Sequence, residues 1–138
     1  NTMCDRPVGL PDRWHFGGQR FQNIFVKIDE IVAWCHQLQL RMCFDISHTR
    51  LTCNHFGIDF YAFAEKIAPL SAHLHLGDAQ GLNGEGLQIG EGDIDFVRLG
   101  KILRKGCPNA SFIPEIWQGH KNGGEGFWIA LEKLEGTL

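Results

Sequence analysis

The chain has 138 residues, of which 43% are hydrophobic and 21% are charged, and its formal net charge is −3. These values are typical of a single globular domain with a hydrophobic core, and they argue against intrinsic disorder. The sequence contains no apolar run of about 18 residues that would indicate a membrane span. It also contains no cluster of Lys and Arg that would indicate a nucleic-acid surface, although charge alone does not exclude a small nuclease with an acidic site.

Helices and strands are predicted to alternate along the chain. Residues 1–20 contain several Gly and Pro residues and are predicted to form a loop. Residues 21–40 carry apolar residues at steps of three and four, which predicts an amphipathic helix, and residues 41–48 form an apolar run with a polar end, which is typical of a buried strand. The same patterns predict, in order, a helix over 59–67, a strand over 71–76, a glycine-rich loop over 77–92, a helix over 95–105, a strand over 111–117 and a helix over 126–134.

This order of elements predicts an α/β fold. Strands that are separated by helices imply parallel pairing with right-handed crossovers. A complete (β/α)8 barrel of the TIM type needs about 250 residues, so we predict that residues 1–138 form a single domain, the C-terminal half of such a barrel, which begins just after a strand that is not present. A flavodoxin-like open sheet has the same order of elements, and the order alone does not decide between the two folds.

All three predicted strands end in residues of the types that can bind metals. They are, in chain order, Asp45 and His48, then His73, His75 and Asp78, then Glu115. In parallel α/β folds, side chains at the carboxyl ends of the strands form the functional site. Buried ionisable groups are costly unless they are paired or bind a metal, so three such strand ends in succession predict one converging site. One imidazole with two carboxylates suits Mn²⁺, Mg²⁺, Co²⁺ or Zn²⁺.

Four short motifs follow one another between residues 41 and 117. They are D-x-x-H in 44–48, H-x-H-x-x-D in 73–78, the glycine-rich segment 89–95, and 113–116 with its glutamate. In this order they resemble the C-terminal half of the xylose isomerase-like TIM barrel superfamily, which includes sugar phosphate isomerases and epimerases and the endonucleases of AP endonuclease family 2. The resemblance implies a barrel fold and a divalent metal as the cofactor.

The resemblance also implies roles for individual residues. Asp45, His75 and Glu115 would be metal ligands, together with a further glutamate on a preceding strand, upstream of Asn1. Glu115 and His48 would be catalytic, and His48 would also contact the substrate. A metal that is chelated by a sugar's carbonyl and adjacent hydroxyl acidifies the intervening C–H bond, and a glutamate then removes the proton to give an enediolate. We therefore predict a divalent-metal-dependent sugar or sugar-phosphate isomerase or epimerase.

Other residues near the strand ends have open roles. His120 is a candidate for a substrate contact, and Trp117 is expected to be either a packing residue or an apolar wall against a sugar. His73 is expected to pack or to orient a ligand through a hydrogen bond, and Asp78 to be either a loop cap or a ligand. Ketose 3-epimerases often have an arginine where this chain has Gly81. Further candidates for substrate recognition are therefore Glu85 and Lys121, besides His120.

Two alternatives to an isomerase or epimerase remain. One is a non-catalytic accessory barrel of a larger carbohydrate-biosynthesis protein. The other is a phosphodiesterase that resembles endonuclease IV, but the positions of that enzyme's extra metal ligands are occupied here by Gly84 and Gly86. These two glycines and the lack of a basic cluster argue against a nucleic acid as partner, and the lack of a long apolar run argues against a membrane.

The cellular setting is predicted from the cysteines and the N-terminal residues. The five cysteines contain no C-x-x-C pair and the N-terminal residues lack the features of a secretion signal, so we expect a cytoplasmic protein with reduced thiols. Half a barrel leaves strand edges unpaired. We therefore expect a homo-oligomer or a part of a longer chain, and little activity from this segment alone.

Overall fold

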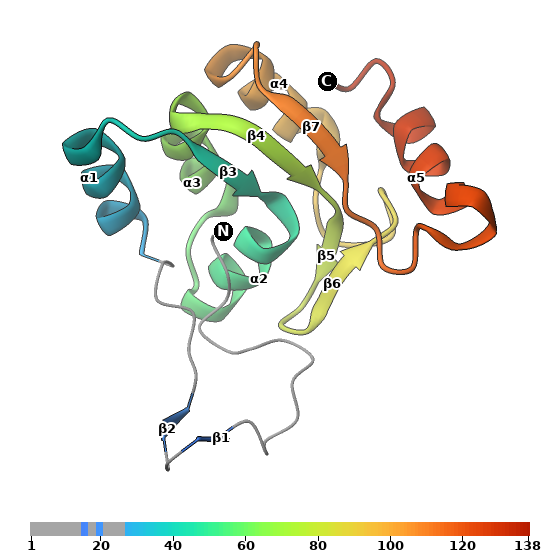
Figure 1. The fold of residues 1–138 in the computed structure, drawn as a ribbon, viewed down its shortest axis with the longest axis horizontal. Coiled ribbons are helices and arrows are strands. Elements are labelled where there is room, and N and C mark those ends of the chain that lie inside the picture. The colour runs from blue at the N-terminus through green and yellow to red at the C-terminus, as the bar shows by residue number, and fades with distance from the viewer. Residues whose placement is uncertain (1–14, 17–18, 21–26) are drawn as a thin grey trace.

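A computed structural model describes residues 15–16, 19–20 and 27–138 of the chain (Figure 1). Near the N-terminus, β1 (His15–Phe16) and β2 (Gln19–Arg20) form a short antiparallel pair. The remainder of the loop predicted over residues 1–20, and the first part of the helix predicted over 21–40, lie outside the described residues. The described part of that helix is α1 (Ile28–Leu38), which buries Ile31 and Cys35.

A parallel sheet of three strands is the centre of the fold. Its strands are β3 (Met42–Asp45), β4 (Ser71–Leu76) and β7 (Ser111–Pro114), in the order β3-β4-β7. The pairing confirms the predicted parallel α/β fold. No closed barrel is formed by the described residues, and β3 and β7 are the two edges of this sheet, as expected for part of a (β/α) barrel.

Helices cover one face of the sheet. The helices α3 (Phe60–Ile67) and α4 (Phe96–Gly106) lie side by side behind the strands in Figure 1. They bury their apolar stripes against the sheet side chains Phe44, Leu74 and Leu76. Each helix begins with an aspartate whose side chain accepts a backbone N–H, Asp59 from Ala62 and Asp95 from Arg98. These caps and stripes explain why both helices were predictable from the sequence.

The segment after β3 differs from the prediction. The strand predicted over 41–48 ends at Asp45. A helix that was not predicted, α2 (Ile46–Phe56), follows at once. Asp45 caps this helix by accepting the N–H of His48 at 3.0 Å, and Gly57 ends it with a φ of 66°. The prediction was wrong because the buried face of α2 includes polar residues, so its hydrophobic period is weak. Those polar residues are Ser47, Thr49 and Thr52.

A β-hairpin lies within the predicted glycine-rich loop. Its strands are β5 (Asp78–Gln80) and β6 (Gly84–Leu87), which pair antiparallel and contact α2. Gly86 joins three segments: its N–H donates to Ser47 Oγ at 2.9 Å, and its carbonyl accepts the N–H of Trp117 at 2.7 Å. The loop prediction missed this hairpin because glycines leave no alternating pattern of apolar side chains.

The C-terminal elements follow the prediction with different ends. The strand predicted over 111–117 ends at Pro114. The last helix, α5, is assigned to Lys121–Leu134, but Asn122, Gly123 and Gly124 have left-handed backbone angles, so its regular part agrees with the predicted 126–134. A short 3₁₀ helix, η1 (Ala68–Leu70), precedes β4. In the described part of the chain, no helix has both the length and the apolar character to span a membrane.

Candidate metal centre

The carboxyl ends of the three parallel strands bring Asp45, His75 and Glu115 together. The strand register places Asp45 of β3 opposite His75 of β4. Glu115 follows β7, and its N–H donates to the carbonyl of Leu76 at 2.9 Å, which holds this residue against the end of β4. One ligand atom from each of the three side chains lies within 4.8 Å of the others. The three ligands predicted from the sequence therefore converge, although the sequence separates them by up to 70 residues.

Close backbone packing makes this convergence possible. A Cβ atom added at Gly77, which follows β4, would lie 2.6 Å from the carbonyl oxygen of Glu115. Such a contact excludes any side chain at this position. Gly77 therefore allows Glu115 to approach the end of β4.

The imidazole of His75 has one buried nitrogen between two carboxylates. Its Nδ1 lies 2.9 Å from Glu115 Oε2 and 3.7 Å from Asp45 Oδ2. This Nδ1 is buried, and it makes no hydrogen bond within the part of the chain that the structure describes. A buried nitrogen without a hydrogen bond is costly, whereas two carboxylate oxygens and a ring nitrogen around one point suit a divalent cation such as Mn²⁺, Mg²⁺, Co²⁺ or Zn²⁺. The three side chains therefore fit the predicted cofactor.

A cavity of about 330 Å³ adjoins this cluster. It is lined by the predicted catalytic and substrate-binding residues, which are Glu115, His48, Trp117 and His120, and by Glu85. Trp117 is 72% exposed. Of its two expected roles, packing in the core is therefore excluded, and its place in the lining of the cavity agrees with the other role, a wall of the site. A larger cavity of about 530 Å³ lies between β7 and α5, but its lining is mainly apolar and contains none of the predicted ligands.

His48 and Glu85 face each other across the cavity's edge. His48 lies in the first turn of α2, and its Nε2 is 3.5 Å from Glu85 Oε2 on β6. Lys121, another candidate for substrate recognition, instead donates to Gln118 Oε1 at 2.9 Å and does not line this cavity. Glu85 was a candidate for substrate recognition from its place in the sequence, but its position opposite His48 was not predicted because the hairpin that carries it was not predicted.

Asp78 anchors the loop before α4 and is not a ligand. The side chain is 0% exposed. Its Oδ1 accepts the N–H groups of Ala79 and Ile94 at 2.8 and 3.2 Å, and its Oδ2 accepts those of Gly90 and Gly92 at 2.9 Å each. A Cβ atom at Gly92 would lie 2.4 Å from Asp78 Oδ1, so the glycine is required at this turn. Of the two roles left open by the sequence, the structure shows the loop cap.

Two cysteines near the sheet are expected to differ in reactivity. Burial raises the pKa of the Cys53 thiol to about 12, and this side chain is 0% exposed. Burial, and then the charge of Asp45, also raise the pKa of Cys43, but Cys43 is only partly buried. We expect iodoacetamide at mildly alkaline pH to modify Cys43 slowly and to leave Cys53 unmodified until the protein unfolds. Peptide mass spectrometry with and without urea measures both sites, and modification of Cys53 before Cys43 would contradict the expectation.

The parallel sheet, its helices and the ligand-type residues at the strand ends together are those of part of a (β/α) barrel of the TIM class. Residues 11–134 match the family model for the xylose isomerase-like TIM barrel, and the chain belongs to this family. The resemblance stated from the four motifs is thereby confirmed. The family includes sugar isomerases and epimerases as well as enzymes that resemble endonuclease IV. No curated protein matches the chain.

Proposed function

We propose that this chain belongs to a divalent-metal-dependent isomerase or epimerase of sugars or sugar phosphates. Asp45, His75 and Glu115 would hold the metal. The observation that carries the proposal is the buried Nδ1 of His75, which makes no hydrogen bond and lies between two carboxylates. A divalent cation at this point would be coordinated by the nitrogen and by both carboxylates at once.

The proposed chemistry is proton transfer next to a carbonyl group. A bound divalent cation would supply electrophilic polarisation, which makes the C–H bond beside the sugar's carbonyl more acidic. Glu115 would remove this proton, because its carboxylate is 48% exposed and lines the cavity. His48, held by the Asp45 cap and facing Glu85, would bind and orient the substrate's hydroxyl groups and assist proton transfer. A second acid would return the proton to the same or the neighbouring carbon.

The cavity supports a sugar-sized substrate. Its volume of about 330 Å³ lies at the lower end of the range for small-molecule sites, about 300–1,000 Å³. Trp117 offers an exposed aromatic side chain for the apolar side of a sugar ring, and His120 in the same lining offers a polar contact. Gly84 and Gly86, which stand where the endonucleases have extra ligands, lie in β6 and supply no ligand side chain.

The first test separates metal binding from folding at Asp45. Asn is as good a helix cap as Asp, so Asp45→Asn is expected to keep α2 while it removes one charged ligand. Asp45→Ala is expected to lose the ligand and about 1 kcal/mol of stability through the lost cap. Plasma mass spectrometry of the full-length protein is expected to find about one divalent ion per chain, and much less in both variants.

The control for this test is Asp93→Asn, which removes a charge from an exposed loop aspartate outside the cluster. This variant is expected to retain the metal. Equal metal content in Asp45→Asn and in the unaltered protein would contradict the proposed centre, and the accessory-barrel alternative would then be favoured.

A further inference from the structure

A second group of possible metal ligands lies one layer below the proposed centre. The register pairs Cys43 of β3 with His73 of β4, and His73 with Ser111 of β7, so these three residues form one row across the sheet. Asp45 and His75 are paired two positions further along the same strands. Because side chains two positions apart point to the same face of a strand, the two rows are stacked on that face.

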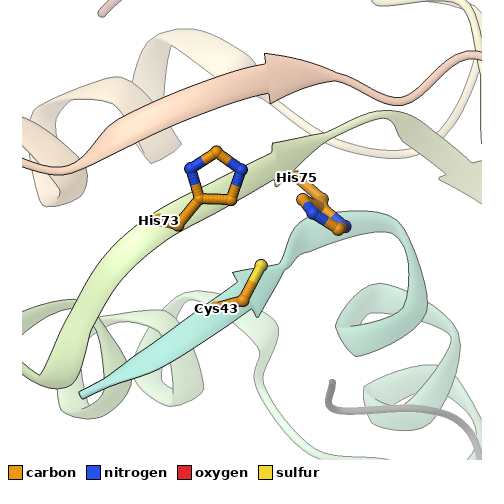
Figure 2. A group of neighbouring side chains, drawn as sticks. All are labelled: Cys43, His73 and His75. Carbon is orange, nitrogen blue, oxygen red and sulfur yellow. The ribbon is translucent and has the colours of Figure 1, made fainter.

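The second group consists of Cys43, His73 and His75. Figure 2 shows the thiol of Cys43 on β3 pointing towards the two imidazole rings on β4. One ligand atom from each residue lies within 4.8 Å of the other two. The two imidazole rings have their centroids 5.3 Å apart and lie perpendicular to each other, so they do not stack.

These distances are close to what a tetrahedral cation needs. With Zn–S and Zn–N bonds of about 2.3 and 2.1 Å, the ligand atoms around zinc lie about 3.6 Å from one another. The upper limit of 4.8 Å exceeds this value by about 1 Å. Small rotations of the side chains would close that gap, because all three are only partly buried.

His73 is already oriented for such a role. Its Nδ1 lies 2.8 Å from Ser111 Oγ. In the tautomer whose Nδ1 donates to this hydroxyl, Nε2 carries the lone pair that a cation requires. Imidazoles that bind metals generally have a hydrogen-bond partner of this kind on their other nitrogen.

We propose that Cys43, His73 and His75 form a second cation site, which is selective for thiophilic ions such as Zn²⁺ and Cd²⁺. One thiolate with two imidazoles is a softer set than the two carboxylates and one imidazole of the upper layer, and soft ligands favour these ions over Mg²⁺ and Mn²⁺. His75 belongs to both groups. A neutral imidazole has one lone pair for a cation, so occupation of the lower site is expected to remove His75 from the upper one. This competition rests on the proposed function, since it requires the upper metal centre.

A cadmium titration tests the second site directly. Binding to a thiolate produces an ultraviolet charge-transfer absorption, and we expect this absorption for the full-length protein with Cd²⁺ alone. Cys43→Ser is expected to abolish the saturable absorption. His73→Asn keeps a donor for Ser111 but lacks Nε2, and it is expected to weaken Cd²⁺ binding about tenfold or more, since even the loss of a partner behind a ligand costs about 10–100-fold. Cys107→Ser, which also removes one thiol but outside both groups, is expected to leave the titration unchanged.

The outcomes distinguish this inference from the proposed function. In Asp45→Asn, which disables only the upper centre, the cadmium absorption is expected to persist. Absence of saturable absorption in the unaltered protein, or its persistence in Cys43→Ser, would overturn the second site without affecting Mn²⁺ binding above it. If both sites exist, Cd²⁺ releases bound Mn²⁺ from the unaltered protein, as followed by electron paramagnetic resonance, and does so only at much higher concentration in Cys43→Ser.

Discussion

Glu115→Gln is expected to lower proton exchange on the sugar substrate by about 10²–10⁴-fold, the contribution typical of a positioned general base. The substitution keeps the size of the side chain but removes both its charge and its basicity. Folding is expected to be unaffected, because the side chain is 48% exposed. Deuterium incorporation from heavy water into candidate sugars, followed by nuclear magnetic resonance, measures the exchange.

Metal content separates the two roles of Glu115. Loss of both metal and exchange would identify it mainly as a ligand, whereas loss of exchange with the metal retained would identify it as the base. Glu125→Gln is the matched control, because Glu125 pairs with Asn122 outside the cavity. Exchange that survives in Glu115→Gln at the level of the control would contradict the proposed mechanism.

The convergence of the candidate ligands could be predicted from the sequence because each of them follows a simple apolar pattern. Asp45, His75 and Glu115 each lie at the polar end of an apolar run, and parallel strands place such ends at one edge of a sheet. Local patterns therefore indicate the strand ends, whereas the resemblance to the family supplies the choice of Asp45, His75 and Glu115 among their residues. The fine geometry, such as the 2.9 Å approach of His75 Nδ1 to Glu115, depends on register and on Gly77, which local patterns do not encode.

The walls of the site could not be predicted in the same way. The helix α2 buries Ser and Thr residues, and the hairpin β5–β6 contains three glycines, so neither segment has the apolar period that reveals a helix or a strand. Both segments are nevertheless needed, because α2 carries His48 and β6 carries Glu85. The row of Cys43, His73 and Ser111 was missed for another reason: its members come from three strands, and only the register brings them together.

The role of Asp78 could not be predicted from the sequence because its hydrogen-bond partners are mostly distant backbone groups. Besides the N–H of Ala79, its carboxylate binds amides 12, 14 and 16 residues further along the chain. No pattern of side chains indicates such contacts, and a loop cap and a ligand both require a carboxylate after β4. The contacts make Asp78 the residue that ties the end of β4 to the loop that enters α4.

Asp78→Asn is therefore expected to destabilise the protein by about 3 kcal/mol or more. The asparagine side chain has one oxygen where the carboxylate has two. Its NH₂ group would therefore replace one accepting oxygen and leave two of the four backbone N–H groups without an acceptor. Each hydrogen bond to a charged group contributes about 1.5–3 kcal/mol, and buried donors left without a partner add to the loss. Urea unfolding followed by circular dichroism measures the change in the free energy of unfolding.

The matched substitution is Asp93→Asn in the same loop. Asp93 is exposed and accepts a single N–H, that of Gly81 at 3.1 Å, so its replacement is expected to cost about 0.5 kcal/mol or less. Because Asp78 anchors the loop and is not part of the proposed metal site, Asp78→Asn is expected to bind a divalent ion as the unaltered protein does, under conditions in which it is still folded. A loss of metal without a loss of stability would instead assign Asp78 to the metal centre, and equal stability of the two variants would show that its four hydrogen bonds do not hold the loop.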